Sequence, residues 1–297
     1  KGLYIYDLEQ EIAGVPKIKF HGKAGTCVTL RYGEMLYPKL PEYGNLHGMI
    51  LTENYRDAES IDHYILRGDP EGEIYCPKFT SHGYRYIEIT GIDTPPALDE
   101  VESIQLSSVK KITGEIKTSN PLVNRFIENV RWSQYCNFIS IPTDCPQRNE
   151  RMGWAGDTHV FCRTATYQSD VRMFYYRYLQ ALKDLQDKNG KLPDIAPVGG
   201  GFGGITYESA MIFMTWELYQ QYGDVSVIET YYDAMKLWMQ YMQIKGMPGD
   251  VFGGPLGDWL APEETDNAFL WNAFYGRDAH LMAKMAKIIG RDSDAAE

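Results

Sequence analysis

The sequence is poor in cysteine, and its cysteines show no pairing pattern. Cys27, Cys76, Cys136, Cys145 and Cys162 are an odd number, and none of them stands in a C-x-x-C pair. Disulfide frameworks and structural zinc sites need closely spaced cysteines, so we expect free thiols that serve mainly as small buried residues. Free thiols favour a reducing compartment, and on this ground we expect a cytoplasmic location.

Several functional motifs are also absent. The sequence has no H-E-x-x-H metal motif, no G-x-S-x-G elbow of a serine hydrolase, and no Gly-Lys-Ser/Thr of a phosphate-binding loop. The glycine-rich stretch 199–204 matches G-x-G-x-x-G, but Pro193 and Pro197 precede it where a dinucleotide site needs a strand. We therefore expect no metal and no cofactor, and we interpret 199–204 as a flexible loop or lid.

The chain lacks an excess of basic residues and any long apolar run. Its formal net charge of −11 argues against nucleic acid as a partner, because phosphate binding needs a basic face. Apolar runs such as MIFM and AFLW are too short to cross a bilayer, so we expect no membrane partner. The first residues, KGLYIYDLEQ, lack an initiator Met and read as structured sequence, so we expect the natural N-terminus upstream, which leaves a signal peptide open.

What is present changes character near residue 106. Before it, runs rich in Val, Ile, Thr and Tyr alternate with turn residues, which predicts an antiparallel β-sandwich over residues 1–106. The remainder, 107–297, is predicted to be helical, with a short helix after Asp157. A Ser-Asn-Pro start signal precedes the first predicted helix. Apolar residues recur at helical spacing over 121–136, 171–187, 206–222, 226–243 and 268–289.

The loops between these helices are long. Residues 192–205 and 245–265 are rich in Gly and Pro, and loops of such length are usually functional or disordered. Short turns that alternate with long loops favour a toroid of helical hairpins with the long loops at one mouth. The predicted fold class is therefore multidomain β + α, an antiparallel β-sandwich followed by a partial (α/α)6 helical toroid.

The segment TDCPQRNERMGWAGD, residues 143–157, gathers charge beside a tryptophan where prolines and glycines disfavour regular structure. Each acid has an ordinary interpretation. Asp144 has capping-box spacing with Gln147, Asp157 could cap the next helix, and Glu150 could form a surface ion pair with Arg148 or Arg151.

The functional interpretation is that the polar side chains of 143–157 converge on one ligand. A glycosidase needs one carboxylic acid to protonate the leaving oxygen and a second carboxylate opposite it. It also needs polar side chains for the sugar hydroxyls and an aromatic ring for the apolar face of the sugar. The candidates are Asp144, Arg148, Glu150, Trp154 and Asp157. A second acid–tryptophan pair, Asp258 and Trp259, could bind sugar as well, or serve as a cap and a packed side chain.

The segment 143–157 resembles the signature of the bacterial α-L-rhamnosidase family of glycoside hydrolases, which reads close to D-C-P-Q-R-D-E-R-x-G-W-x-G-D. The resemblance covers nearly the whole chain: YCPKFTSHGYRYIEITG is similar to the family's β-sandwich, and NPLVNRFIENVRWSQYCNFISIPTDCPQR and GDWLAP are similar to its (α/α)6 barrel. It implies that the partner is a rhamnose-containing glycoside and that terminal α-L-rhamnose is released with inversion. By position it makes Glu150 the general acid, places the rhamnose hydroxyls on Asp144, Arg148 and Asp157, and lines the pocket with Trp154.

Two positions depart from the family pattern. Asn149 stands where the family usually has Asp, which removes one negative charge beside Glu150. Tyr207, Glu208 and Ser209 stand where the family more often has a Trp-Gly-Asp segment. Our hypothesis is that Glu208 replaces the lost contact, offset by one position.

The second carboxylate is not evident in this sequence. A six-hairpin barrel needs about twelve helices, and we expect the missing helices and the family's general base beyond residue 297. Asp258 is the best local substitute. Two alternatives stay open: a non-catalytic sugar-binding fragment, and a polysaccharide lyase with a helical toroid. Against the lyase, three acids at the site would repel a carboxylated sugar.

Overall fold

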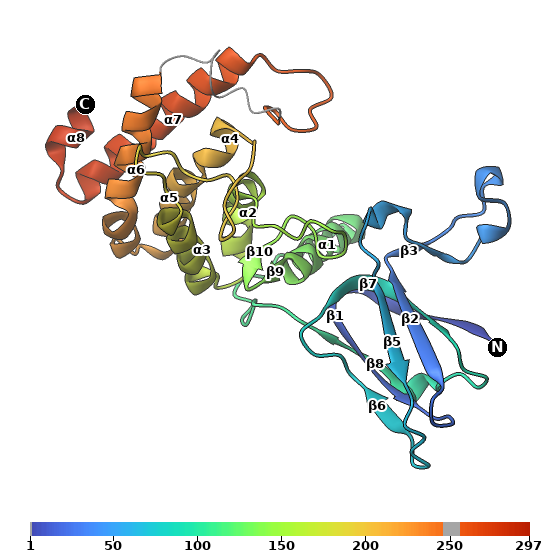
Figure 1. Ribbon diagram of the computed structural model, residues 1–297. Coiled ribbons are helices and arrows are strands. Elements are labelled where there is room, and N and C mark those ends of the chain that lie inside the picture. The colour runs from blue at the N-terminus through green and yellow to red at the C-terminus, as the bar shows by residue number, and fades with distance from the viewer. Residues whose placement is uncertain (1, 246–255) are drawn as a thin grey trace. The chain divides into compact units, whose positions relative to one another are not determined.

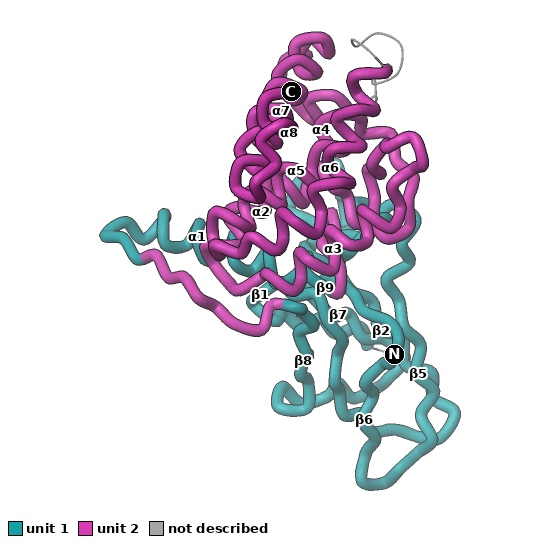
Figure 2. Tube along the Cα trace, turned by 90° about the vertical axis from the view of Figure 1, so that its left-hand side faces the viewer, with its two compact units in different colours: residues 1–108, 117–139, 145–151 teal, residues 109–116, 140–144, 152–297 magenta. Residues whose placement is uncertain are grey.

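In a computed structural model, residues 2–245 and 256–297 are described and form two compact units (Figures 1 and 2). The first unit comprises 1–108, 117–139 and 145–151, coloured teal in Figure 2. The second comprises 109–116, 140–144 and 152–297. The units are thus interleaved along the chain, and the single boundary after residue 106 stays a prediction. Of the predicted long loop 245–265, residues 246–255 lie outside the described residues.

The first unit is built on an antiparallel sheet in the order β5–β2–β7–β1–β6, with β8 also paired to β1 (Figure 1). Its strands are β1 (Leu3–Phe20), β2 (Cys27–Gly33), β5 (Ile61–Ile65), β6 (Glu73–Tyr75), β7 (His82–Thr90) and β8 (Val101–Gln105). A short antiparallel ladder joins β3 (Met35–Leu36) to β4 (Ile50–Leu51). The 3-10 turns are η1 (Pro41–Leu46), η2 (Glu53–Tyr55) and η3 (Leu98–Glu100). The antiparallel β structure expected of this region is confirmed.

Strand β1 is long because it changes partners along its length. It pairs with β7 from Leu3 to Asp7 and again from Ile12 to Gly14, with a register shift between the two stretches. Beyond Gly14 it pairs with β8 and then with β6. Glu9, inside the shift, has a positive φ of 61°, as expected where an extra residue bulges from a strand. The sheet closes over an apolar core of Ile12, Ile18, Phe20, Val28, Leu30, Tyr32, Leu66, Tyr84, Ile87, Ile89 and Ile92.

Helix α1 (Pro121–Asn137) begins where the sequence predicts and packs against β1 in the first unit. The side chain of Asn120 accepts hydrogen bonds from the backbone N–H groups of Leu122 and Val123, and Pro121 occupies the first turn. Both features satisfy the start of a helix without loss of an internal hydrogen bond. The short strands β9 (Phe138–Ile139) and β10 (Ile141–Pro142) follow.

The second unit is helical. The helices predicted from periodicity are confirmed, except that 206–222 is divided at Ser209 into two segments. The helix near Asp157 begins two residues before that acid. The bounds are α2 (Ala155–Gln168), α3 (Arg172–Asp184), α4 (Ile205–Glu208), α5 (Ala210–Tyr222), α6 (Ser226–Lys245), α7 (Asn267–Ile288) and α8 (Asp292–Ala296).

Helix α5 is the centre of this packing, because it contacts α2, α3, α4, α6 and α7. Its sequence is apolar almost all round, as expected of a helix surrounded by neighbours. The buried residues of α5 include Met211, Ile212, Phe213, Met214 and Leu218. Within the described ranges, no helix has an apolar stretch long enough to span a membrane. None of the five cysteines forms a disulfide; Cys27 and Cys76 are exposed and the other three are buried.

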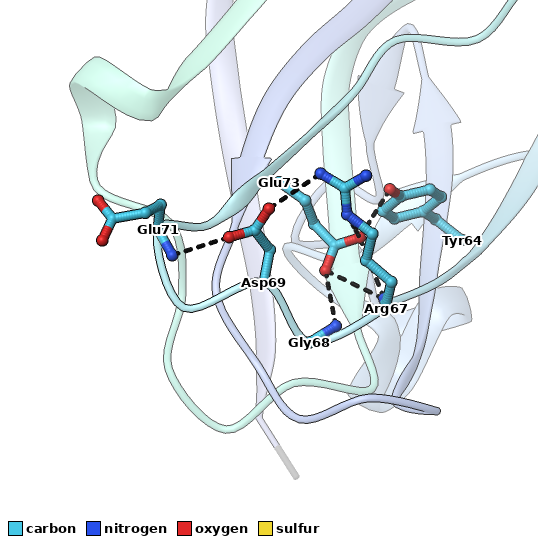
Figure 3. A network of polar contacts seen from close by, with 6 residues as sticks. All are labelled: Tyr64, Arg67, Gly68, Asp69, Glu71 and Glu73. Atoms are coloured by element: carbon cyan, nitrogen blue, oxygen red, sulfur yellow. Dashed lines mark hydrogen bonds and ion pairs between the residues drawn. The ribbon is translucent and has the colours of Figure 1, made fainter.

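A buried carboxylate fixes the turn before β6 (Figure 3). Glu73 is only 3% exposed, and its oxygens accept hydrogen bonds from the backbone N–H groups of Arg67 and Gly68 and from the hydroxyl of Tyr64. Burial by itself raises the pKa of Glu73, but these hydrogen bonds outweigh it and hold the pKa below its usual value. The ionised form of Glu73 therefore stabilises the folded state.

We predict that Glu73→Gln lowers the melting temperature of the protein at neutral pH and not at acidic pH. A depressed pKa contributes stability above the unfolded-state value, and this contribution is lost as the pH falls through the folded-state value. Thermal melts at decreasing pH should show the two proteins converging as the pH falls through the folded-state pKa of Glu73, because both side chains are uncharged below it. The exposed neighbour Glu71→Gln is the control and should match wild type throughout. A deficit of Glu73→Gln that is equal at all pH values would contradict this account.

Candidate functional site

The segment 143–157 does not begin with a helix. The Oδ1 atom of Asp144 accepts a hydrogen bond of 2.8 Å from the backbone N–H of Met152, and the Asp144 N–H donates to the Met152 carbonyl at 3.0 Å. Asp144 therefore ties the two ends of the intervening loop together. The capping-box interpretation of Asp144 with Gln147 is wrong, because no helix follows Asp144 directly.

Trp154 stands immediately before α2 and is packed among aromatic rings. Its ring lies edge-on to those of Phe202 and Tyr207, with centroids 5.5 Å and 5.4 Å away, and it is only 7% exposed. Its backbone is bridged to Ile195, and the adjacent Gly153 carbonyl accepts a hydrogen bond of 2.7 Å from the Tyr178 hydroxyl. Its position at the start of α2 is therefore fixed by contacts from three other segments.

Asp157 lies in the first turn of α2 and not at its cap, which Trp154 occupies. The interpretation of Asp157 as a helix cap is therefore wrong. The helix dipole favours a carboxylate in this first turn, and the side chain is exposed. Asp157 lines a cavity of about 270 Å³, with further lining from Gly156, His159, Thr206, Tyr207, Gly257, Asp258, Trp259 and Phe274.

The cavity brings together three of the seven candidate residues. Asp157 lies on α2, whereas Asp258 and Trp259 lie on the loop before α7 (Figure 1). Trp259 is 57% exposed, so its ring is available to a ligand, and Asp258 is held by a hydrogen bond of 2.7 Å from the Thr265 hydroxyl. Asp144, Arg148, Glu150 and Trp154 are not among the residues that line this cavity.

Glu150 and Arg148 belong to the first unit and form an ion pair with each other. A second arginine, Arg56, places its Nη1 atom 3.2 Å from the same Oε2 atom of Glu150. Arg151, the other expected partner, donates instead to the carbonyls of Ser81 and Gln147. Glu150 is 22% exposed, so it remains accessible to a ligand while two cations fix its position.

Two buried acids, Asp194 and Glu208, lie beside the glycine-rich loop, and the sequence pattern singles out only Glu208. Asp194 is 3% exposed and its Oδ2 accepts a hydrogen bond of 2.9 Å from the backbone N–H of Gly203; burial raises its pKa. Glu208 is 2% exposed and its Oε1 lies 3.1 Å from Nζ of Lys191. Burial, with a contribution from the charge of Asp194, raises the pKa of Glu208 to about 7. The glycine-rich loop is therefore tied to Asp194, and Glu208 is directed at a lysine.

A further buried acid, Asp278, is hydrogen-bonded to Ser209, the residue after Glu208. The hydroxyl of Ser209 donates a hydrogen bond of 2.6 Å to Oδ2 of Asp278, and the same oxygen accepts a weaker bond of 3.3 Å from Nε1 of Trp238. Asp278 is fully buried, and burial raises its pKa to about 8. Its environment is structural: it links α5, α6 and α7. In the described part of the chain, no group of three or more His, Cys, Asp or Glu residues is arranged to hold a metal ion.

Family models match both parts of the chain. Residues 1–107 match the concanavalin-like domain of bacterial alpha-L-rhamnosidases, and residues 111–297 match their 6 hairpin glycosidase domain. These matches, with the observed strands and helices, confirm the predicted fold class of an antiparallel β domain followed by a partial six-hairpin helical domain.

Individual relatives agree with the family match. The chain is 36% identical to an alpha-L-rhamnosidase of Streptomyces avermitilis over 98% of this chain and 28% of that protein. The crystal structure of the Streptomyces avermitilis alpha-L-rhamnosidase complexed with L-rhamnose superposes with a TM-score of 0.89, at 34% identity, over 98% of this chain and 28% of that one. The structure of an alpha-L-rhamnosidase from Dictyoglumus thermophilum gives a TM-score of 0.90 at 32% identity, over 99% and 33%. The chain thus spans about a third or less of the length of these relatives.

We predict that Gly156→Ala destabilises the protein by displacing Tyr207. A Cβ atom at Gly156 would lie 2.5 Å from the Tyr207 ring, which is too close for any side chain. Overpacking of this kind costs roughly 1–3 kcal/mol, measurable as a lower urea midpoint of the full-length protein. Gly276→Ala, within α7, is the matched control because nothing lies within 4 Å of its Cβ position; it should be neutral or stabilising. Equal midpoints for the two variants would show that Tyr207 is free to move.

Proposed function

This chain belongs to the bacterial α-L-rhamnosidase family, and on that premise we propose that its protein hydrolyses terminal α-L-rhamnosides with inversion at the anomeric carbon. The observation that carries the proposal is the cavity lined by Asp157, Asp258 and Trp259. It combines two carboxylates and an exposed aromatic ring, which are the groups that bind the hydroxyls and the apolar face of a sugar.

Glu150 is the proposed general acid. Cleavage of a glycosidic bond leaves negative charge on the departing oxygen, and a carboxylic acid within hydrogen-bond reach removes that charge by protonating it. Arg148 and Arg56 both contact Oε2 of the carboxyl group, which stays partly exposed. Arg148 is proposed to contact a rhamnose hydroxyl as well, because a guanidinium carries five N–H donors in a fixed planar arrangement that suits oxygen acceptors.

The remaining candidates are proposed to bind and orient the sugar. Asp157 and Asp258 accept hydrogen bonds from hydroxyls, and Trp259 covers one face of the ring. Asp144 closes the loop that carries Glu150 through its bond to Met152 and is proposed to contact a rhamnose hydroxyl. Trp154 does not line the cavity but packs edge-on against Tyr207, and Tyr207 lines the cavity. The general base that inversion requires is assigned to no residue in the described ranges.

We predict that Glu150→Gln abolishes most turnover of rhamnosides whose leaving group needs a proton. Loss of general-acid catalysis costs roughly 10²–10⁴-fold in rate. The loss should be large for a rhamnosyl disaccharide and smaller for 4-nitrophenyl α-L-rhamnoside, whose leaving group departs as a stable anion. Kinetics of the full-length protein on both substrates test this, and L-rhamnose binding should persist in the variant. The exposed Glu102→Gln is the control.

Three outcomes would count against the proposal. Wild type that binds L-rhamnose without turnover would be a sugar-binding protein. An unsaturated, ultraviolet-absorbing product would indicate a lyase. Proton NMR of the fresh product distinguishes the stereochemistry: inversion releases β-L-rhamnose from an α-linked substrate, and initial release of the α anomer would contradict the inverting mechanism.

We predict that Trp259→Ala weakens L-rhamnose binding roughly tenfold, equivalent to about 1.4 kcal/mol, because the sugar loses the aromatic ring that covers it. Titration calorimetry on the full-length protein measures the change. Phe269→Ala, an exposed aromatic residue on α7 that does not line the cavity, is the control and should bind as wild type does. If Trp259→Ala binds L-rhamnose as tightly as wild type, the sugar lies elsewhere.

A further inference from the structure

Two consecutive residues of the first unit, Arg56 and Asp57, contact two consecutive residues of the segment 143–157. Arg56 Nη1 lies 3.2 Å from Oε2 of Glu150, and the next residue, Asp57, accepts a hydrogen bond of 3.2 Å on Oδ2 from Nδ2 of Asn149. Arg56 and Asp57 directly follow η2, and Arg56 adopts a positive φ of 56°. All four residues belong to the first unit.

The rest of the segment 145–151 is held by the same unit. Nε2 of Gln147 donates to Oε2 of Glu34 at 3.1 Å, and Nη1 of Arg151 donates to the carbonyl of Ser81 at 2.8 Å. Gly83 approaches the segment so closely that a Cβ there would lie 2.8 Å from Cβ of Gln147. Residues of the first unit outside the segment therefore contact it before Asn149 and after Glu150. Arg56 and Asp57 add contacts to Glu150 and Asn149 themselves.

We propose that Arg56 and Asp57 are positioning residues that set the orientation of the Glu150 carboxyl group toward the leaving oxygen. This rests on the proposed function, in which Glu150 is the acid. Through Arg56 and Asp57 the β-sheet part of the first unit contributes to catalysis, although neither residue needs to touch the sugar. Their distribution of charge fits the role, since Arg56 attracts the carboxylate of Glu150 and Asp57 accepts from the neighbouring amide.

Asn149 is matched to Asp57. Its amide donates a hydrogen bond that an aspartate at the same position could not, so the substitution Asn149→Asp would place two carboxylates in contact. Conversely, the substitution Asp57→Asn would again supply a donor for an aspartate at position 149. Positions 57 and 149 should therefore accept one acid and one amide in either arrangement. Asp57→Asn should accordingly rescue the defect of Asn149→Asp.

The interaction acts on geometry more than on stability. Arg56 is 59% exposed, and ion pairs of that exposure contribute little to folding. Misplacement of a catalytic group by about 1 Å, in contrast, can cost roughly 10²-fold in rate. Substitutions that break one of these contacts, such as Arg56→Gln or Asn149→Asp, should therefore lower kcat while the melting temperature and the KM for rhamnosides change little.

The experiment compares the full-length wild type with Asn149→Asp, Asp57→Asn, the double variant and Arg56→Gln, on 4-nitrophenyl α-L-rhamnoside and on a rhamnosyl disaccharide. We expect Asn149→Asp and Arg56→Gln to lower kcat on the disaccharide by roughly tenfold or more, with a smaller loss on the nitrophenyl substrate and KM within about twofold. The double variant should recover most of the loss of Asn149→Asp. The exposed Arg67→Gln in the same unit is the control.

Equal losses on the two substrates, or a double variant no better than Asn149→Asp, would overturn the positioning role. The proposed function fails separately, if wild type cleaves neither rhamnoside. Hydrogen exchange of the peptide that covers 145–151 then still tests the contact itself: exchange should be faster in Asn149→Asp and return to the wild-type rate in the double variant. Unchanged exchange in Asn149→Asp would show that Asp57 does not hold the segment.

Discussion

The cavity in the helical unit depends on the close approach of one tyrosine ring to the first turn of α2. Tyr207 reaches that turn only because Gly156 has no side chain, and the ring then packs against Trp154. This contact sets α4 beside α2, so that Thr206 and Tyr207 line the same space as Asp157. A larger residue at 156 would clash with the Tyr207 ring. Asp157, which we propose to bind the sugar, thus owes its place beside Thr206 and Tyr207 to an apolar contact.

Much of the fold follows from local signals in the sequence. Asn120 and Pro121 start α1 where capping rules place it, and the apolar surface of α5 correctly predicts a helix enclosed by others. The signature segment identified the family because its long irregular pattern is specific. Capping rules failed at Asp144, because a carboxylate at suitable spacing can satisfy a backbone N–H in a loop as well as at a helix end. They failed at Asp157 because α2 begins two residues before it. Local spacing does not distinguish the two.

The parts that the sequence does not reveal are those created by tertiary contacts. Nothing local to Asp258 and Trp259 indicates that they share a cavity with Asp157, which lies far earlier in the chain. The burial of Asp194 and Glu208 is equally hidden, because acids beside a glycine-rich loop usually face solvent. Arg56 lies far from the signature in sequence, in a stretch with no motif at all, and only the fold brings it to Glu150.

Each of the two departures from the family pattern places a hydrogen-bond donor against an acid supplied by another segment. Asn149 donates to Asp57, and Ser209 donates to the buried Asp278. The second case links positions 209 and 278. An aspartate at position 209 would place a second carboxyl group against the buried Asp278, and the pair would have to share a proton to avoid an uncompensated buried charge. The effect of an aspartate at 209 should therefore depend on which residue stands at 278.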